Sequence, residues 1–184
     1  MNGILISDII KTYLEIQVPL RNDIGWFKDL RSICQDIGVR WQMGYYHITM
    51  AFVDETPIGV DLRPLLEKYL RNFPAPILTF DKLDAFTSMS GMHVIYLKAT
   101  EVPKSFMSLV HAIRTDLRSA GCVMNSNFQL HVTLGRVKDP RTQLSTLHKM
   151  LETVCLSAFS LTLTDVDYRV FRGGTIYEAK LASK

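Results

Sequence analysis

Segments with the alternating pattern of β-strands and segments with the periodicity of α-helices follow one another along the whole chain, and this mixture constrains the fold most. Alternation of apolar and polar residues predicts strands over 13–20, 45–53, 77–86, 92–99, 128–137, 159–166 and 168–181, the last of which contains Arg172-Gly-Gly174. Apolar residues at helical spacing predict helices over 23–37, 61–73, 103–120 and 140–154. Asp23 is the expected N-cap of the first helix and Gly38 its stop. Since no linker or low-complexity segment interrupts the pattern, we expect a single α+β domain over residues 1–184.

The composition indicates an ordinary globular protein. Hydrophobic residues make up 47% of the chain and charged residues 21%, which excludes a disordered or collagen-like chain. A net charge of +3 does not by itself indicate a nucleic-acid partner. The N-terminus lacks the basic and apolar regions of a signal peptide, and no apolar run is long enough to span a membrane. Three cysteines without Cys-x-x-Cys spacing (Cys34, Cys122 and Cys155) indicate reduced thiols in the core of a cytoplasmic protein.

Two predicted strands carry the same tripeptide, His-x-Thr. These are His47-Ile-Thr49 and His131-Val-Thr133, 84 residues apart. In a strand, alternate residues share a face, so each histidine points the same way as its threonine. The apolar neighbours, namely Ile48, Met50 and Phe52 in one strand and Val132 and Leu134 in the other, are expected to face the core. Each motif strand lies between two predicted helices, which indicates a coarse internal symmetry.

If the two motif strands meet, two imidazoles and two hydroxyls converge. Because an imidazole titrates near pH 6.5, one histidine can accept a proton while the other donates one. Threonine hydroxyls can hold nonbridging phosphate oxygens. This set suits in-line cleavage of a phosphodiester without a metal, and no His/Cys/Asp cluster in the sequence has the spacing of a zinc site. The sequence leaves open which histidine is the acid and which the base. Coincidental motifs in a structural protein would instead leave the histidines far apart.

The two motifs with their flanking residues, His47 to Phe52 and His131 to Arg136, resemble the signatures of the two-histidine (2H) phosphoesterase superfamily, specifically its LigT-like branch. The resemblance extends to Arg40-Trp41, to the strand Val94–Leu97 and to Gly174 with Tyr177. It implies a bilobal fold with pseudo-symmetric lobes, whose antiparallel sheets flank a central cleft. It also implies the activity of an RNA 2′,3′-cyclic phosphodiesterase, an enzyme also described as a 2′-5′ RNA ligase.

The resemblance assigns roles to individual residues. It makes His47 and His131 the catalytic pair, Thr49 and Thr133 the phosphate holders, and Arg136 an accessory phosphate contact. Strict alternation places Arg136 on the face opposite His131, so it can reach the site only if the strand bulges, twists or ends near Gly135. Because aromatic faces stack on nucleobases, the candidates for base stacking are Trp41, Tyr45, Phe171 and Tyr177.

The sequence therefore predicts a metal-independent, cofactor-free and monomeric phosphodiesterase. We expect it to open 2′,3′-cyclic phosphate ends of RNA or small nucleotides to 2′-phosphates. The alternatives are a 2′-5′ oligonucleotide phosphodiesterase or ligase, and a nucleotide- or RNA-binding module without turnover. A protein that only binds would not need both an acid and a base, which favours the enzyme.

Overall fold

The computed structural model describes residues 10–125, 129–139 and 141–182. The predicted starts of one strand at Phe128 and one helix at Pro140, and residues 1–9 of the N-terminus, lie outside this part. Within it the strands are β1 (Ile10–Val18), β2 (Val39–Trp41), β3 (Tyr46–Thr56), β4 (Ile77–Thr87), β5 (His93–Glu101), β6 (Val123–Met124), β7 (His131–Val137), β8 (Phe159–Thr162), β9 (Asp165–Val170) and β10 (Thr175–Lys180). The helices are α1 (Gly25–Ile33), a 3₁₀ turn (Gln35–Ile37), α2 (Arg63–Leu70), α3 (Lys104–Ser119) and α4 (Leu144–Glu152).

Each predicted helix and most predicted strands are present, with three corrections. The C-terminal region forms three strands rather than two, because β8 ends at Thr162 beside β4, whereas β9 begins at Asp165 and pairs with β1 and β10. The strands β2 and β6 are too short to show a period in the sequence. Asp23 does not cap α1: it pairs with the Arg21 guanidinium at 2.6 Å, and Ile24 occupies the N-cap position without a side-chain bond. The α-helix itself ends at Ile33 with Cys34 as its C-cap, and Gly38, with a φ of +60°, ends the 3₁₀ turn that follows.

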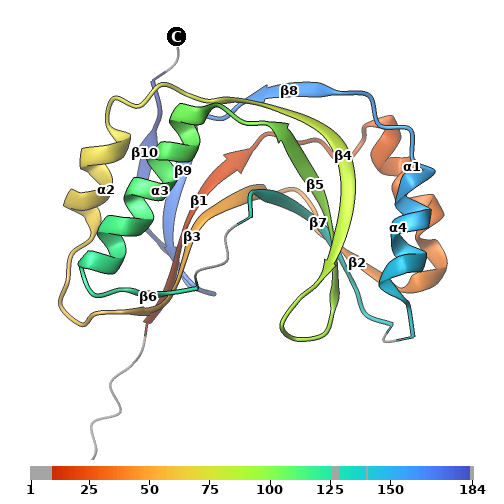
Figure 1. Cartoon of the computed structure of the whole chain (residues 1–184), viewed down its shortest axis with the longest axis horizontal. Coiled ribbons are helices and arrows are strands. Elements are labelled where there is room, and N and C mark those ends of the chain that lie inside the picture. The colour runs from red at the N-terminus through yellow and green to blue at the C-terminus, as the bar shows by residue number, and fades with distance from the viewer. Residues whose placement is uncertain (1–9, 126–128, 140, 183–184) are drawn as a thin grey trace, which may run out of the picture.

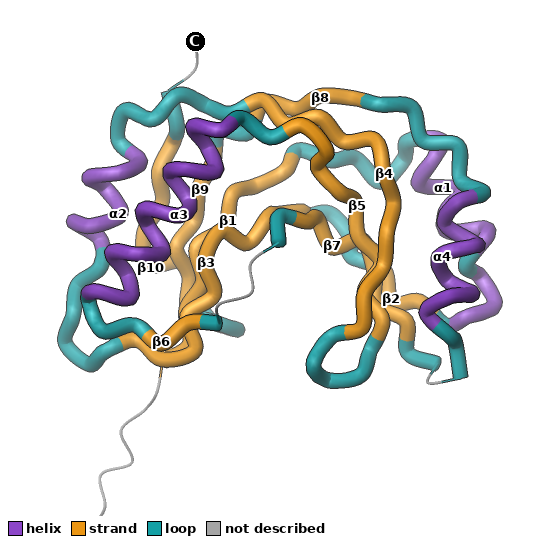
Figure 2. Tube along the Cα trace, in the orientation of Figure 1, coloured by secondary structure: helices purple, strands orange, loops and turns teal. Residues whose placement is uncertain are grey.

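The strands form one curved sheet in the order β10-β9-β1-β3-β7-β5-β4-β8. The pairs along this path are antiparallel. The two expected sheets are therefore halves of one sheet, joined where β3 pairs with β7. Helices cover only the outer face, with α2 and α3 over one half and α1 and α4 over the other (Figure 1). Figure 2 shows the same arrangement as an arch of strands with a helix pair on each flank.

The hydrophobic core lies between the outer face of the sheet and the helices. Ile48 of β3 and Val132 of β7 have no exposed surface, and neither do Phe27 of α1 and Phe106 of α3. The apolar residues between the His-x-Thr positions thus anchor both halves of the sheet, as the alternation predicts. Cys34 and Cys122 are buried free thiols, whereas Cys155 is exposed, contrary to the expectation that all three lie in the core.

No helix in the described ranges is long and apolar enough to cross a membrane.

A β-bulge follows each His-x-Thr tripeptide. In β3, Leu14 pairs with Ala51 but Glu15 pairs with Thr49, which leaves Met50 as the extra residue. The alternation therefore resumes one residue late, and Phe52 lies on the face of His47 rather than facing the core as predicted. The cause is the extra residue, which exchanges the two faces of the strand beyond it.

The bulge in β7 has the equivalent position. Ile95 pairs with Gly135 and Tyr96 with Thr133, so Leu134 is the extra residue. This bulge brings Arg136 to the face of Thr133 and His131, as the role implied for Arg136 requires. Phe52 and Arg136 thus occupy matching positions, three residues after Thr49 and Thr133 respectively.

We expect Gly135→Ala to destabilise the protein. A Cβ atom at this position would lie 2.7 Å from Cγ1 of Val39 and 2.9 Å from Cε3 of Trp41, so the neighbours must move. The free energy of unfolding in urea should fall by about 1–3 kcal/mol. Gly174→Ala is the control, because a Cβ atom there meets nothing within 4 Å. Equal stability of the two variants would show that the β7 bulge tolerates a side chain.

Candidate active site

The pairing of β3 with β7 brings the two His-x-Thr tripeptides together. Ile48 and Val132 are Cα partners in an antiparallel pair. His47 therefore lies beside Thr133, and Thr49 beside His131. All four side chains lie on the inner face of the sheet, opposite the helices. Within the described part of the chain, the two threonine hydroxyls make no side-chain hydrogen bond, so both are available to a ligand.

The ring of His131 is held by a backbone carbonyl and by aromatic side chains. Its Nδ1 donates to the Gln129 carbonyl oxygen at 2.9 Å. The Gln129 amide in turn donates to the Tyr96 hydroxyl at 2.9 Å. The rings of Phe86 and Tyr96 pack edge-on against the imidazole, with centroids 5.3 and 5.5 Å away. Because Nδ1 carries the donated proton, Nε2 is the nitrogen of His131 that remains for proton transfer.

The ring of His47 lies against a different, acidic neighbourhood. Its Nε2 is 3.4 Å from Oε2 of Glu15, a carboxyl with no exposed surface. The Tyr45 hydroxyl donates to the other oxygen of Glu15 at 2.5 Å and to Asp167 at 3.1 Å. Arg169 completes the group, with Nη1 3.5 Å from Oε1 of Glu15.

Sequence reasoning about function missed Glu15, Asp167 and Arg169. The available signal is that Tyr13, Glu15 and Gln17 alternate along β1 and so share a face. The strands that pair with β1 are β3 and β9, and this pairing is not visible in the sequence.

Electrostatics favour the neutral form of both imidazoles. Burial, followed by the charges of His131, Arg169 and Arg136, lowers the pKa of His47 to about 4. Burial and the charge of Arg136 also lower the pKa of His131, against the opposing effect of the bond to Gln129. A bound phosphate would offset these cations and raise both values, because an anion stabilises an imidazolium. A bound anion therefore favours protonation of the two imidazoles.

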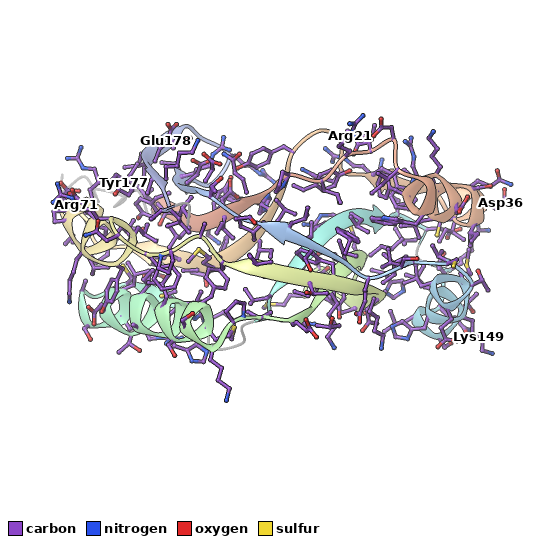
Figure 3. The ribbon with its side chains drawn as sticks, turned by 90° about the horizontal axis from the view of Figure 1, so that it is seen from above. Arg21, Asp36, Arg71, Lys149, Tyr177 and Glu178 are labelled. Carbon is purple, nitrogen blue, oxygen red and sulfur yellow. The ribbon has the colours of Figure 1, made fainter. Side chains whose placement is uncertain are left out.

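The predicted stacking residues fall into two groups. Trp41 lies on the core side of the sheet, where its ring packs edge-on against Phe27 at 5.6 Å. Tyr177 packs at the α2 end of β10, and Figure 3 shows it near Arg71. The structure thus places these two aromatic residues in packing positions apart from the histidines, as expected for aromatic residues of a sheet.

The other two stacking candidates lie on the side of His47. The ring of Tyr45 is 5.6 Å from the His47 ring and is covered by the Arg169 guanidinium at 5.7 Å. Phe171 is 43% exposed and forms an aromatic cluster with Phe52, at 5.7 Å, and Tyr13, at 6.5 Å. The Arg172 guanidinium lies over the Phe171 ring at 5.2 Å, so Phe171 is set apart from Tyr45 by its exposure and not by a bare ring face.

Two further histidines have packing contacts outside this site. His93 bonds to the Thr87 hydroxyl and to the Thr142 carbonyl, and His148 bonds to the Ala85 carbonyl at 2.9 Å. Among residues 10–125, 129–139 and 141–182, no group of three His, Cys, Asp or Glu side chains is arranged to hold a metal ion.

The fold and the paired motifs agree with comparisons to known proteins. The family model of the 2′-5′ RNA ligase superfamily matches residues 25–175, so the chain belongs to this superfamily. Its structure is similar to that of TT0787 from Thermus thermophilus, with a TM-score of 0.66 and 16% identity over 95% of this chain and 99% of that one. It is also similar to Escherichia coli LigT complexed with NADP+ (TM-score 0.62, 18% identity, 96% and 99% covered) and to Kluyveromyces marxianus Usb1 (TM-score 0.64, 12% identity, 93% and 98% covered). No curated protein sequence matches the chain.

We expect Arg136→Gln to raise the pKa of both imidazoles, because its positive charge disfavours the imidazolium in each. An NMR titration of the imidazole C–H resonances should show both midpoints at higher pH. Arg40→Gln is the matched control, since Arg40 is the β2 partner of Arg136 and its charge does not contribute to either shift. Unchanged midpoints in Arg136→Gln would show that its side chain lies outside the site.

Proposed function

We propose that this protein is a phosphodiesterase that opens 2′,3′-cyclic phosphate ends of RNA or small nucleotides, with His47 and His131 as its acid/base pair. The observation that carries the proposal is the Ile48–Val132 pairing, which brings both His-x-Thr tripeptides to one face of the sheet. Family membership supports phosphodiester chemistry in general. Escherichia coli LigT is known as a complex with 3′-AMP, which supports a nucleotide as the ligand.

The proposed mechanism assigns one task to each side chain. Thr49 and Thr133 hold the nonbridging oxygens of the cyclic phosphate, and Arg136 offsets its charge. One histidine removes a proton from water, which attacks phosphorus. The other donates a proton to the 3′ oxygen as the bond between phosphorus and that oxygen breaks, which leaves a 2′-phosphate. If a 5′ hydroxyl takes the place of water in this step, the same set forms a 2′-5′ linkage, because the bond from phosphorus to the 3′ oxygen breaks in the same way.

Incubation with a 2′,3′-cyclic-phosphate oligonucleotide in the presence of a chelator tests the reaction. We expect a 2′-phosphate product at an undiminished rate, because side chains supply the acid, the base and the phosphate contacts. A 3′-phosphate product, or a requirement for added metal, would overturn the proposal. If only 2′-5′ oligonucleotides are cleaved, or if nucleotides bind without turnover, one of the two alternative functions holds instead.

Single replacements of the histidines should remove activity and leave the fold intact. We expect His47→Ala and His131→Ala each to lower kcat by roughly 100- to 10,000-fold. The double variant should lose little more, because acid and base act in one step. His148→Gln is the control, since it is remote from the inner face and an amide can keep the bond to the Ala85 carbonyl. Near-normal kcat in either alanine variant would contradict the mechanism.

Phe171→Ala should weaken substrate binding with little effect on kcat. Stacking on an aromatic ring contributes about 1–3 kcal/mol per base, so KM should rise roughly 5- to 150-fold. Ile176→Ala is the control, because Ile176 is 41% exposed on β10 and offers no ring. Equal KM values for the two variants would show that the base does not stack on Phe171.

A further inference from the structure

A short row of basic side chains leads away from His131 across the inner face of the sheet. Lys98 of β5 is the Cα partner of His131, and Lys82 of β4 is the Cα partner of Lys98. Residues that pair in this way point to the same face, so both lysines share the inner face with the catalytic candidates. From the spacing of neighbouring strands, the backbone of Lys98 lies roughly 5 Å and that of Lys82 roughly 10 Å from that of His131.

Both ammonium groups are available to an anion. Lys82 is exposed and Lys98 half-buried, and neither forms an ion pair, a side-chain hydrogen bond or a ring contact with another described residue. Asp84 lies on the same face of β4, but its carboxylate is 3.3 Å from Nε2 of His148. The lysines are therefore cations whose charge no neighbouring carboxylate neutralises by direct contact.

The half of the inner face beyond His47 has the opposite character. Glu15 of β1 and Asp167 of β9 are Cα partners, so two carboxyls stand side by side there. The cations of this half contact carboxylates, since Arg169 is 3.5 Å from Glu15 and Lys180 is 3.8 Å from Asp165. The two halves lie on opposite sides of the β3–β7 contact (Figure 1). An anionic chain that enters the site is therefore attracted toward β5 and β4 and repelled from β1 and β9.

We propose that Lys98 and Lys82 bind the phosphates that precede the cyclic end of an RNA chain, and so make the enzyme prefer oligonucleotide ends to single nucleotides. The inference rests on the proposed function and names the substrate class of the same site. A nucleoside 2′,3′-cyclic phosphate has one phosphate, which the threonines hold, and it leaves the lysines without a ligand. Each nucleotide added before the cyclic end supplies one further phosphate, whatever its base.

A series of three substrates that end in the same cyclic nucleotide tests the preference. The series consists of the nucleoside 2′,3′-cyclic phosphate, the dinucleotide and the trinucleotide. We expect the wild-type kcat/KM to rise with each added phosphate. In the double variant Lys82→Gln, Lys98→Gln, the ratio of kcat/KM for the trinucleotide to that for the nucleoside should fall roughly 2- to 30-fold, the effect of losing two exposed ion pairs.

Lys180→Gln is the matched control. It makes the same change at an exposed lysine of the sheet, but Lys180 belongs to the acidic half and contacts Asp165. This variant should keep the wild-type ratio of the two kcat/KM values.

The salt dependence of binding gives a readout that does not need turnover. Fluorescence anisotropy of a labelled trinucleotide with a 3′-phosphate measures the binding constant at several salt concentrations. Each contact between a lysine and a phosphate of a single strand contributes about 0.7 to the slope of log binding constant against log salt. The slope of the double variant should therefore be smaller by about 1.4 than that of the wild type.

Three results would overturn the proposal. They are an equal slope in the wild type and the double variant, an equal loss of kcat/KM for the nucleoside and the trinucleotide, and a fall of the ratio in Lys180→Gln as large as in the double variant. If the wild type opens no cyclic phosphate, the proposed function fails instead. The difference in slope then still decides whether Lys98 and Lys82 bind RNA phosphates.

Discussion

The antiparallel contact between β3 and β7 is the constraint on which the rest of the structure depends. It joins the two halves of the curved sheet and sets which residues of each strand face the helices. The same register that buries Ile48 and Val132 puts His47 and His131 on the opposite face. Because a slip of one residue exchanges the two faces of a strand, core and site are specified together. A sequence that keeps the core in register therefore keeps the catalytic candidates in register as well.

Two similar halves provide unlike surroundings for the two histidines. His131 donates to a backbone carbonyl and packs between Phe86 and Tyr96. His47 faces the buried carboxyl of Glu15 and the hydroxyl group that holds it. The equivalent positions after the two bulges also differ between the halves. The half with His47 has an aromatic ring there (Phe52), and the half with His131 has a cation (Arg136). The two halves share a backbone arrangement but surround their histidines with different groups. An acid/base pair requires such a difference, because one histidine must carry a proton that the other lacks.

Periodicity predicted the elements and the faces of the motif residues, because both follow from the repeat of the backbone. It could not predict the bulges, since an extra residue has no periodic signal until its partner strand is known. Phe52 was therefore assigned to the wrong face. Trp41 and Tyr177 show a second limit, because an aromatic residue in a strand suits either a core or a ligand. Glu15 shows a third limit of the sequence. Its contacts with Tyr45 and Arg169 depend on which strands lie beside β1, and this order is not visible in the sequence.

The order of the strands also affects how the protein folds. The paired residues Ile48 and Val132 are distant in sequence, and β1 bonds to β9 through Thr12 and Tyr168, which are 156 residues apart. Contacts of such long sequence separation close large loops, and folding through them is slow. Helices and local hairpins such as β4–β5 form without these contacts, whereas the two histidines meet only when distant segments have paired. During refolding, recovery of the site therefore reports completion of the fold, later than signals from secondary structure.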